Sequence, residues 1–445
     1  MGKTLCIVHS VDTEGPLYES IEATFSRLKE LFNLEFKDQN NEVLDRLKKG
    51  LINLNGKEKI VQNVLNSHLL DYNDTWDKIQ LMLDEIMSDK FRKKYEDDFK
   101  GNWKFSWHCL DHVGFEYNPR RRDMGYHNIF DYYKSVLSRS PQFGDDIQWH
   151  FHPMSTYKEA HRCATSFVNS PELYQILTRR IIEREWFPSV FRAGFQSERP
   201  DSNWFLEQWI PFDLSNMSLD DNSELEQSID FKLGRSGNWR NAPSDWSLYH
   251  PSHDNYQIPG NCRRIIARSL NILNRIASIN EMETDKAFLL ANKNKNVLLG
   301  ISSHDFRDLR TEVDYVYKLL KKSQKKFPDV KLKFCTGLEG FREVVYNNRP
   351  LNRKIDLNIE LFKPVKDDVP NLLIDVKQGE VFGPQPFLAI ETKSRRFIHD
   401  NLDIIEIGKK WGYAFHSDTL PIHDVNRIGV ACNDFFGNTF VKVLK

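Results

Sequence analysis

The chain has 445 residues, 28% of them charged, and a formal net charge of −1. This length exceeds that of most single cores and predicts two domains, or one large α/β domain with additions. The balanced charge excludes a global basic field that would attract nucleic acid. No apolar run approaches the roughly 18 residues that a membrane-spanning helix needs.

The first apolar run, residues 3–10, predicts a buried strand that leads into a polar motif. The run is too short for the core of a secretion signal. The six cysteines are scattered and form no CxxC pair. Reduced thiols in a cytoplasmic protein are therefore expected.

Helical periodicity then predicts a long helical insertion at about 20–100. Beyond it, strand and helix patterns alternate. Strands are expected at 103–110, 147–152, 190–192, 297–301 and 331–336, and helices near 127–138, 171–186, 261–280, 308–326 and 338–346. Across 212–260, rich in Asn, Ser, Asp and Pro, loops and short strands are expected. The alternation predicts an α/β fold with a mostly parallel barrel or sheet over residues 1–350.

The hydrophobic pattern of the sequence changes in the last hundred residues. Alternating β-branched and aromatic runs predict strands at 357–362, 372–376, 387–392, 404–407, 428–431 and 439–444. Residues 351–445 are therefore expected to form a small, separate all-β module.

Candidate metal-binding and catalytic residues lie at the ends of several of the expected strands. His150 and His152 share one face if their segment is a strand, and such a pair can chelate a zinc-type ion. Asp12 and Glu14 are likewise two residues apart and could supply a metal ligand and a proton acceptor. Taken alone, the carboxylates are also compatible with a solvated turn, and the histidines with a hydrogen-bonded core pair.

Two further strand ends complete this set. Arg192 precedes an Ala-Gly pair and could hold a carboxylate, although a structural ion pair is the plainer interpretation. His304 ends an apolar run and is a candidate general acid, or a structural histidine.

A basic loop is a weaker candidate for substrate binding. Arg120, Arg121 and Arg122 could bind a phosphate or carboxylate, but such runs are usually solvated. His112 and Tyr126 flank the loop and could line a pocket. No GxGxxG, P-loop, HExxH or GxSxG motif is present, which argues against nucleotide-binding and serine-hydrolase functions.

The order of the motifs resembles that of the NodB-homology polysaccharide deacetylases, metal-dependent hydrolases with a distorted, usually seven-stranded (β/α) barrel. Residues 11–16 (VDTEGP) look like the family's first motif, His150 and His152 like the second, 191–194 (FRAG) like the third and 303–305 (SHD) like the last. The resemblance covers residues 3–345 and leaves the C-terminal module unexplained.

The resemblance implies roles for the motif residues. Asp12 would be the general base, and Glu14 would bind the metal with the histidine pair. Arg192 would orient the base, and His304 would protonate the leaving amine. The family's adjacent carboxylates are here separated by a threonine, so the roles of Asp12 and Glu14 could be exchanged.

The second and third motifs depart from the family pattern. The family's histidines are usually four residues apart rather than two, and His161 is a possible stand-in. The usual proline beside the arginine of the third motif is absent. These departures, with the helical insertion, point to a specialised branch or to one that has lost the activity.

The implied function is removal of an N-acyl or O-acyl group from a sugar with the help of a divalent metal, for which zinc is expected. The setting would be the biosynthesis of a bacterial cell-surface polysaccharide or glycoconjugate. An activated or soluble sugar in the cytoplasm is the expected substrate. The alternative is an inactive deacetylase-like barrel that binds a glycan or a protein partner. The oligomeric state stays open.

Overall fold

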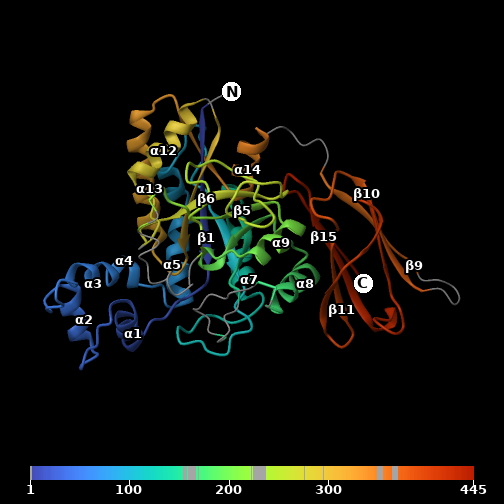
Figure 1. Cartoon of the computed structure of the whole chain (residues 1–445), viewed down its shortest axis with the longest axis horizontal. Helices are drawn as coiled ribbons and strands as arrows, with labels where there is room; N and C mark the ends of the chain where they lie inside the picture. The colour runs from blue at the N-terminus through green and yellow to red at the C-terminus, as the bar shows by residue number, and fades with distance from the viewer. Residues whose placement is uncertain are drawn as a thin grey trace.

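A parallel barrel forms the centre of the molecule in a computed structural model, which describes residues 3–153, 158, 167–168, 170–221, 223, 237–274, 276–293, 295–347, 354–362 and 369–445 (Figure 1). The strands are β1 (Thr4–Thr13), β2 (Ser106–Leu110), β3 (Asp146–Phe151), β4 (Val190–Ala193), β5 (Phe212–Asn216), β6 (Ile265–Asn271), β7 (Val297–His304) and β8 (Lys331–Cys335). β1 to β7 close into a seven-stranded ring because β1 pairs with both β7 and β2, and β8 adds to β1. The predicted parallel barrel is confirmed.

Strand β1 shows why the barrel carries its polar residues at one end. Side chains alternate between the two faces of a strand. Leu5, Ile7 and Val11 pack into the large core shared with the surrounding helices. Cys6 and Val8, on the opposite face, belong to a smaller apolar cluster with residues of β4, β5, β6 and β7. The apolar residues of this second face therefore lie in the first part of the strand, and Asp12 continues the same face at its carboxyl end.

Most of the expected helices are present, with small shifts at their ends. Those that follow the barrel strands are α7 (Asn128–Arg139), α8 (Glu172–Arg184), α9 (Pro200–Trp209), α12 (Glu281–Asn292), α13 (Leu309–Lys326) and α14 (Gly337–Tyr346). Helix α9 was not expected from the sequence.

The helix predicted at 261–280 is wrong. The chain forms strand β6 there, and the helix α12 begins only at Glu281. Arg264 and Arg268 are four residues apart, as on the polar face of a helix, yet both are completely buried. Arg264 pairs with Glu198 and Asp213, and Arg268 with Glu283. The spacing of these two arginines therefore reflects buried ion pairs and not the solvated face of a helix.

The helical insertion contains α1 (Ile21–Phe32), α2 (Asn41–Lys48), α3 (Glu58–Val64), α4 (Ser67–Leu70), α5 (Trp76–Ile86) and α6 (Asp89–Lys94). Helices α1 to α4 form a lobe beside the barrel, whereas α5 and α6 pack against the barrel and contribute to its large core (Figure 1). Helices α1 to α3 have their own small apolar core around Phe25, Leu28 and Leu47. The Ser20 side chain accepts a hydrogen bond from the backbone of Ala23 and so caps α1.

The C-terminal residues form two small antiparallel sheets, so the expected all-β character is confirmed. One sheet has the order β13-β14-β10-β9 and the other β12-β11-β15-β16. The bounds are β9 (Asp356–Phe362), β10 (Asn371–Gln378), β11 (Phe387–Thr392), β12 (Phe397–Asp400), β13 (Asp403–Glu406), β14 (Lys410–Ala414), β15 (Val425–Asn433) and β16 (Thr439–Leu444). The short strands β12 and β14 were not expected.

The second of these sheets packs on the barrel through α8. Phe387, Ala389 and Ala431 of the sheet share a buried cluster with Ile181 of α8. Gly429 of β15 allows the close approach, because a Cβ there would lie 2.5 Å from a methyl carbon of Ile181. The C-terminal module is therefore fixed to the outside of the barrel. Among the described residues, no helix is long and apolar enough to cross a membrane.

Candidate metal centre

The polar residues at the strand ends converge at the carboxyl end of the barrel. In the sheet register Asp12 lies beside His304 of β7 on one side and beside His108 of β2 on the other. His150 of β3 lies beside Arg192 of β4. Parallel strands present their carboxyl ends at the same rim, which explains how residues far apart in the sequence meet there.

Glu14, His150 and His152 form a buried group that could hold a metal ion. The Nε2 atoms of the two histidines lie 2.9 Å apart. Oε1 of Glu14 lies 3.4 Å from Nε2 of His152 and 3.8 Å from Nε2 of His150. Ligand atoms about 2.0–2.1 Å from a tetrahedral ion stand roughly 3.3–3.4 Å apart. The three atoms therefore have nearly the spacing of one face of such a coordination shell.

The hydrogen bond of Nδ1 determines the tautomer of His150. Nδ1 lies 2.9 Å from the carbonyl oxygen of Arg192, to which only a protonated nitrogen can donate. The neutral ring therefore carries its proton on Nδ1 and directs the Nε2 lone pair toward Glu14 and His152. This backbone hydrogen bond is the kind of outer contact that orients metal-binding histidines.

The Glu14 carboxylate divides its two oxygens between different partners. Oε2 accepts a hydrogen bond from Arg122, which leaves Oε1 directed at the histidines. Burial raises the pKa of Glu14, but the charges of Arg122 and His152 outweigh burial and hold the pKa well below its usual range. Glu14 is thus an anion with one oxygen available to a cation.

Asp305 positions the turn that carries Glu14. Its two oxygens accept hydrogen bonds from the backbone N–H groups of Glu14 and Gly15, at 2.9 and 3.0 Å. Tyr133 donates a further hydrogen bond to it at 2.9 Å. Burial raises the pKa of Asp305 to about 7 despite these bonds.

Asp12 lies next to the three potential ligands but is held differently. Nε of Arg192 donates to both carboxylate oxygens, at 2.7 and 2.9 Å, and the same guanidinium bonds the carbonyl of Leu214. Burial raises the pKa of Asp12, but the charge of Arg192 together with the nearby histidines outweighs burial, so the pKa is lowered. The nearest nitrogen of His150 is Nδ1, at 3.6 Å, which is already bonded to the Arg192 carbonyl. This geometry favours Glu14 over Asp12 as the third ligand.

His304 faces both carboxylates from the cavity side. Its Nε2 lies 3.9 Å from Asp12 Oδ2 and 3.8 Å from Glu14 Oε1. Its side chain is 21% exposed, whereas those of the two carboxylates are 4% exposed. Burial lowers the pKa of His304 to about 4, although both carboxylates oppose that shift. Its imidazole is therefore the part of the group most accessible to a ligand.

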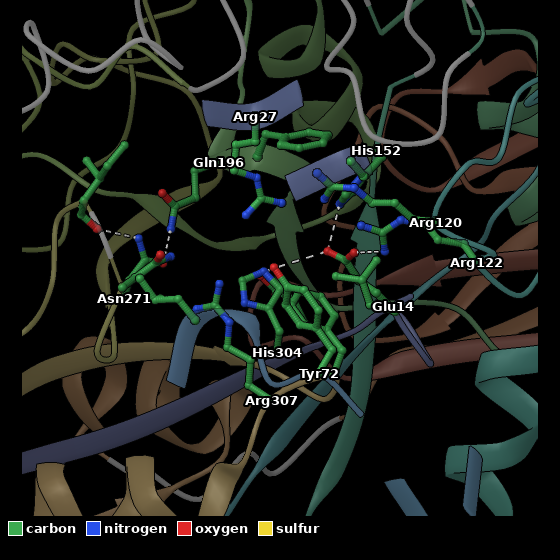
Figure 2. A pocket seen from close by; sticks show the side chains of 18 of the residues that line it. Glu14, Arg27, Tyr72, Arg120, Arg122, His152, Gln196, Asn271, His304 and Arg307 are labelled. Carbon is green, nitrogen blue, oxygen red and sulfur yellow. Dashed lines mark hydrogen bonds and ion pairs between the residues drawn. The ribbon is translucent and has the colours of Figure 1, made fainter. Parts of the chain in front are cut away.

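A cavity of about 520 Å³ opens over this group. One wall is the barrel rim with Asp12, Glu14 and His304, and the other is the insertion lobe with Arg27 of α1 and Tyr72. In Figure 2 dashed lines join the Glu14 carboxylate to His152, Arg122 and His304. The insertion is therefore part of the site, which the sequence did not reveal.

The weaker candidates divide between the cavity and its surroundings. Arg120 and Arg122 line the cavity. Arg121 has its guanidinium 4.0 Å above the ring of Tyr18 and does not contribute to the lining. His112 donates from Nδ1 to the Asp123 carbonyl and is buried behind the lining. Tyr126 hydrogen-bonds Gln175 of α8, away from the cavity.

Several residues of the site carried no recognisable motif. Tyr72, Gln196, Asn271, Arg27 and Arg307 all line the cavity. Asp305 could have been noticed because it follows His304 directly in the chain. His161, the possible stand-in for a histidine ligand, lies outside the described residues. Comparisons of the chain with family models, with curated proteins and with solved structures give no match.

Proposed function

We propose that this protein is a metal-dependent hydrolase that removes an N-acyl or O-acyl group from a sugar, on a barrel of the NodB-homology type. The observation that carries the proposal is the meeting of Glu14, His150 and His152 beside the Asp12–Arg192 pair. Potential metal ligands, a separate carboxylate and an accessible imidazole are the groups that hydrolysis of an amide at a metal site requires.

The proposed metal is a divalent ion, with zinc favoured by two imidazoles and one carboxylate. Bound there, such an ion supplies Lewis-acid chemistry, because it polarises a carbonyl oxygen and lowers the pKa of water at an open coordination position. Glu14 Oε1 and the Nε2 atoms of His150 and His152 would hold it. Arg122 keeps the second oxygen of Glu14 away from that position.

Asp12 is assigned the role of general base. Its carboxylate is ionised, since Arg192 lowers its pKa, and so it can accept a proton from an attacking water. The paired bonds from Arg192 fix the direction of both oxygens. A fixed base contributes to rate because the proton acceptor need not be reoriented when the water attacks.

His304 is assigned the role of general acid. In the hydrolysis, oxygen of water adds to the acyl carbon, the bond from that carbon to nitrogen breaks, and both protons of the water end on the nitrogen. With a pKa of about 4, His304 is neutral before the reaction and must first receive the proton that it gives. Its Nε2 atom is 3.9 Å from Asp12 Oδ2 and is exposed to the cavity, so it is placed to take the water proton from Asp12 and to pass it to the departing amine. The products are a carboxylate and the ammonium form of the amino sugar.

A binding protein without activity is the rival function, and one contact favours it. Arg122 forms an ion pair with Glu14 and so neutralises the charge of one potential ligand. A site stabilised by that pair could bind a glycan without chemistry. Metal content and acyl release separate the two functions.

The test is release of acetate from a panel of free, nucleotide-linked and lipid-linked N-acetyl sugars, with zinc supplied. We expect release from at least one member. His304→Asn should lower kcat by about 10²–10⁴-fold, the usual contribution of a proton-transfer group. The control variant is Arg46→Gln, an exposed position of the insertion lobe. A zinc-loaded protein that releases acetate from no substrate would contradict the proposal.

A further inference from the structure

We infer that the cavity contains a subsite for a phosphate group of the substrate, formed by Arg27, Arg120 and Arg307. This inference rests on the proposed function and names the class of its substrate: an acylated sugar that carries a phosphate. The three arginines come from α1, from the loop after β2 and from the turn after β7. In Figure 2 their guanidinium groups are directed into the same cavity.

The first argument is the balance of charge. Among the described residues that line the cavity, the arginines are Arg27, Arg120, Arg122, Arg192 and Arg307, and the carboxylates are Asp12, Glu14 and Glu30. Arg192 and Arg122 are each bonded to a carboxylate of the metal centre. A divalent ion at that centre would add further positive charge. The cavity therefore favours an anionic ligand over a neutral one.

The second argument is that Arg27 and Arg120 share one carboxylate. Glu19, which is 4% exposed, accepts a hydrogen bond from Arg27 and lies 3.9 Å from the guanidinium of Arg120. Burial lowers the pKa of Arg120, and the positive charge of Arg27 lowers it further. Two guanidinium groups held close together beside the buried carboxylate of Glu19 provide donors for a dianion.

The third argument concerns Arg307. Its backbone N–H bonds the carbonyl of His304, so the residue is fixed directly beside the proposed acid. Within the described part of the chain, no carboxylate forms an ion pair with its guanidinium, and its Nε is buried without a hydrogen-bond partner. An arginine in this state gains both a counter-charge and an acceptor when an oxyanion binds.

The size of the cavity is compatible with such a substrate. A volume of about 520 Å³ is typical of sites for small molecules. Phe306 and Tyr72, with ring centroids 5.6 Å apart, supply an apolar surface next to His304, whose ring is 4.7 Å from that of Phe306. A sugar ring can lie against this surface while its acyl group faces the metal centre and its phosphate faces the arginines.

The direct test is calorimetric titration with inorganic phosphate, on the protein as purified and again after chelation of its metal. We expect binding in both states, weakened about 10-fold or more by Arg307→Gln and by Arg27→Gln. Arg46→Gln, exposed on the same lobe as Arg27, should bind phosphate as the parent does. Thermal melts identify any variant that fails to fold. Arg307→Gln is less prone to unfold than Arg27→Gln, since the guanidinium that it removes forms no ion pair among the described residues.

Two outcomes overturn the subsite. One is the absence of phosphate binding, and the other is binding that is lost on chelation and unchanged in Arg307→Gln, which would place the anion on the metal. A kinetic experiment distinguishes failure of the subsite from failure of the proposed function. We expect a phosphorylated N-acetyl sugar to exceed its neutral counterpart in kcat/KM through a lower KM. Release of acetate from both with equal KM contradicts the subsite alone, whereas no release with intact phosphate binding contradicts the hydrolase alone.

Discussion

Gly194 lies directly against His152. A Cβ atom on Gly194 would stand 2.0 Å from Cδ2 of the imidazole and 2.8 Å from the backbone Cα of the same histidine. Non-bonded atoms do not approach so closely, so any larger residue at position 194 forces the imidazole ring of His152 to move. The glycine that follows the strand β4 therefore sets the position of one potential metal ligand.

Gly194→Ala is expected to displace His152 and to weaken zinc binding by about 10–100-fold, the usual effect of disturbing a contact that orients a ligand. The strain should cost roughly 1–3 kcal/mol of unfolding free energy, so the protein stays folded. Competition with a zinc chelator measures the affinity. Gly412→Ala in the C-terminal module is the control, because the nearest atom to a Cβ there is the flexible end of the Ile405 side chain, 3.1 Å away. An unchanged zinc affinity in Gly194→Ala would exclude His152 as a ligand.

Asp305→Ala is expected to lower the unfolding free energy by about 3 kcal/mol or more. The buried N–H groups of Glu14 and Gly15 and the hydroxyl of Tyr133 would each lose an acceptor, and each such loss costs roughly 1–3 kcal/mol. Urea unfolding gives the value. Asp308→Ala, which removes the half-exposed N-cap of α13 and its surface ion pair with Arg310, should cost about 1 kcal/mol. Equal losses in both variants would show that Asp305 does not anchor the turn.

The pair Asp12–Arg192 allows structure and catalysis to be separated. Asp12→Asn or Arg192→Met alone leaves a buried charge without its partner and should cost about 3–5 kcal/mol. The double variant should cost clearly less than the sum of the two, because neither charge remains. Urea unfolding measures all four proteins.

Acetate release should not follow the same pattern. The double variant lacks the base and should stay inactive although part of its stability returns. Activity in the double variant would remove Asp12 from the mechanism. Additive losses of stability would show that the two side chains are not coupled.

The burial of His9 leads us to expect a loss of folding stability in acid. Trp103 can only donate to Nδ1 of His9, so the neutral ring bears its proton on Nε2 and donates to Ser303. Burial, aided by the charge of Arg92, lowers the pKa of His9 to about 3. The fold thus favours the neutral ring. The stability that this gives is complete above the unfolded pKa of about 6.5 and decreases as the pH falls below it.

Between pH 6.5 and pH 5 this single group should cost the parent about 2 kcal/mol. Other buried histidines add to the slope, so the quantity to compare is the difference between the parent and His9→Gln in urea unfolding at the two pH values. The variant should be less stable at pH 7 and less sensitive to acid. Parallel stability curves would contradict this assignment.

The strand-end residues could be predicted from the sequence because local rules determine them. A histidine pair with period two and a carboxylate pair with period two each share a face, and parallel strands bring their carboxyl ends together. Asp12, His150 and Arg192 therefore met as expected. Strand β6 was instead predicted as a helix, since the burial of Arg268 against its partner Glu283 cannot be recognised from spacing.

The second wall of the cavity could not be predicted. Arg27 belongs to an amphipathic helix whose sequence shows only that it packs on something, and its approach to Arg120 depends on how the whole lobe folds over the barrel. Arg307 follows a motif residue, yet only the structure shows that no carboxylate of the described residues forms an ion pair with it. Long-range packing of the insertion determines the shape of the site.

The most direct test of the central claim is the zinc content of the purified protein, compared with that of the His150→Ala, His152→Ala double variant. The geometry of the three ligand atoms predicts a single stoichiometric zinc ion in the parent and its loss in the variant, with both proteins folded by circular dichroism. The same zinc content in both proteins, or none in a parent supplied with zinc, would contradict the metal centre on which the proposed hydrolase rests.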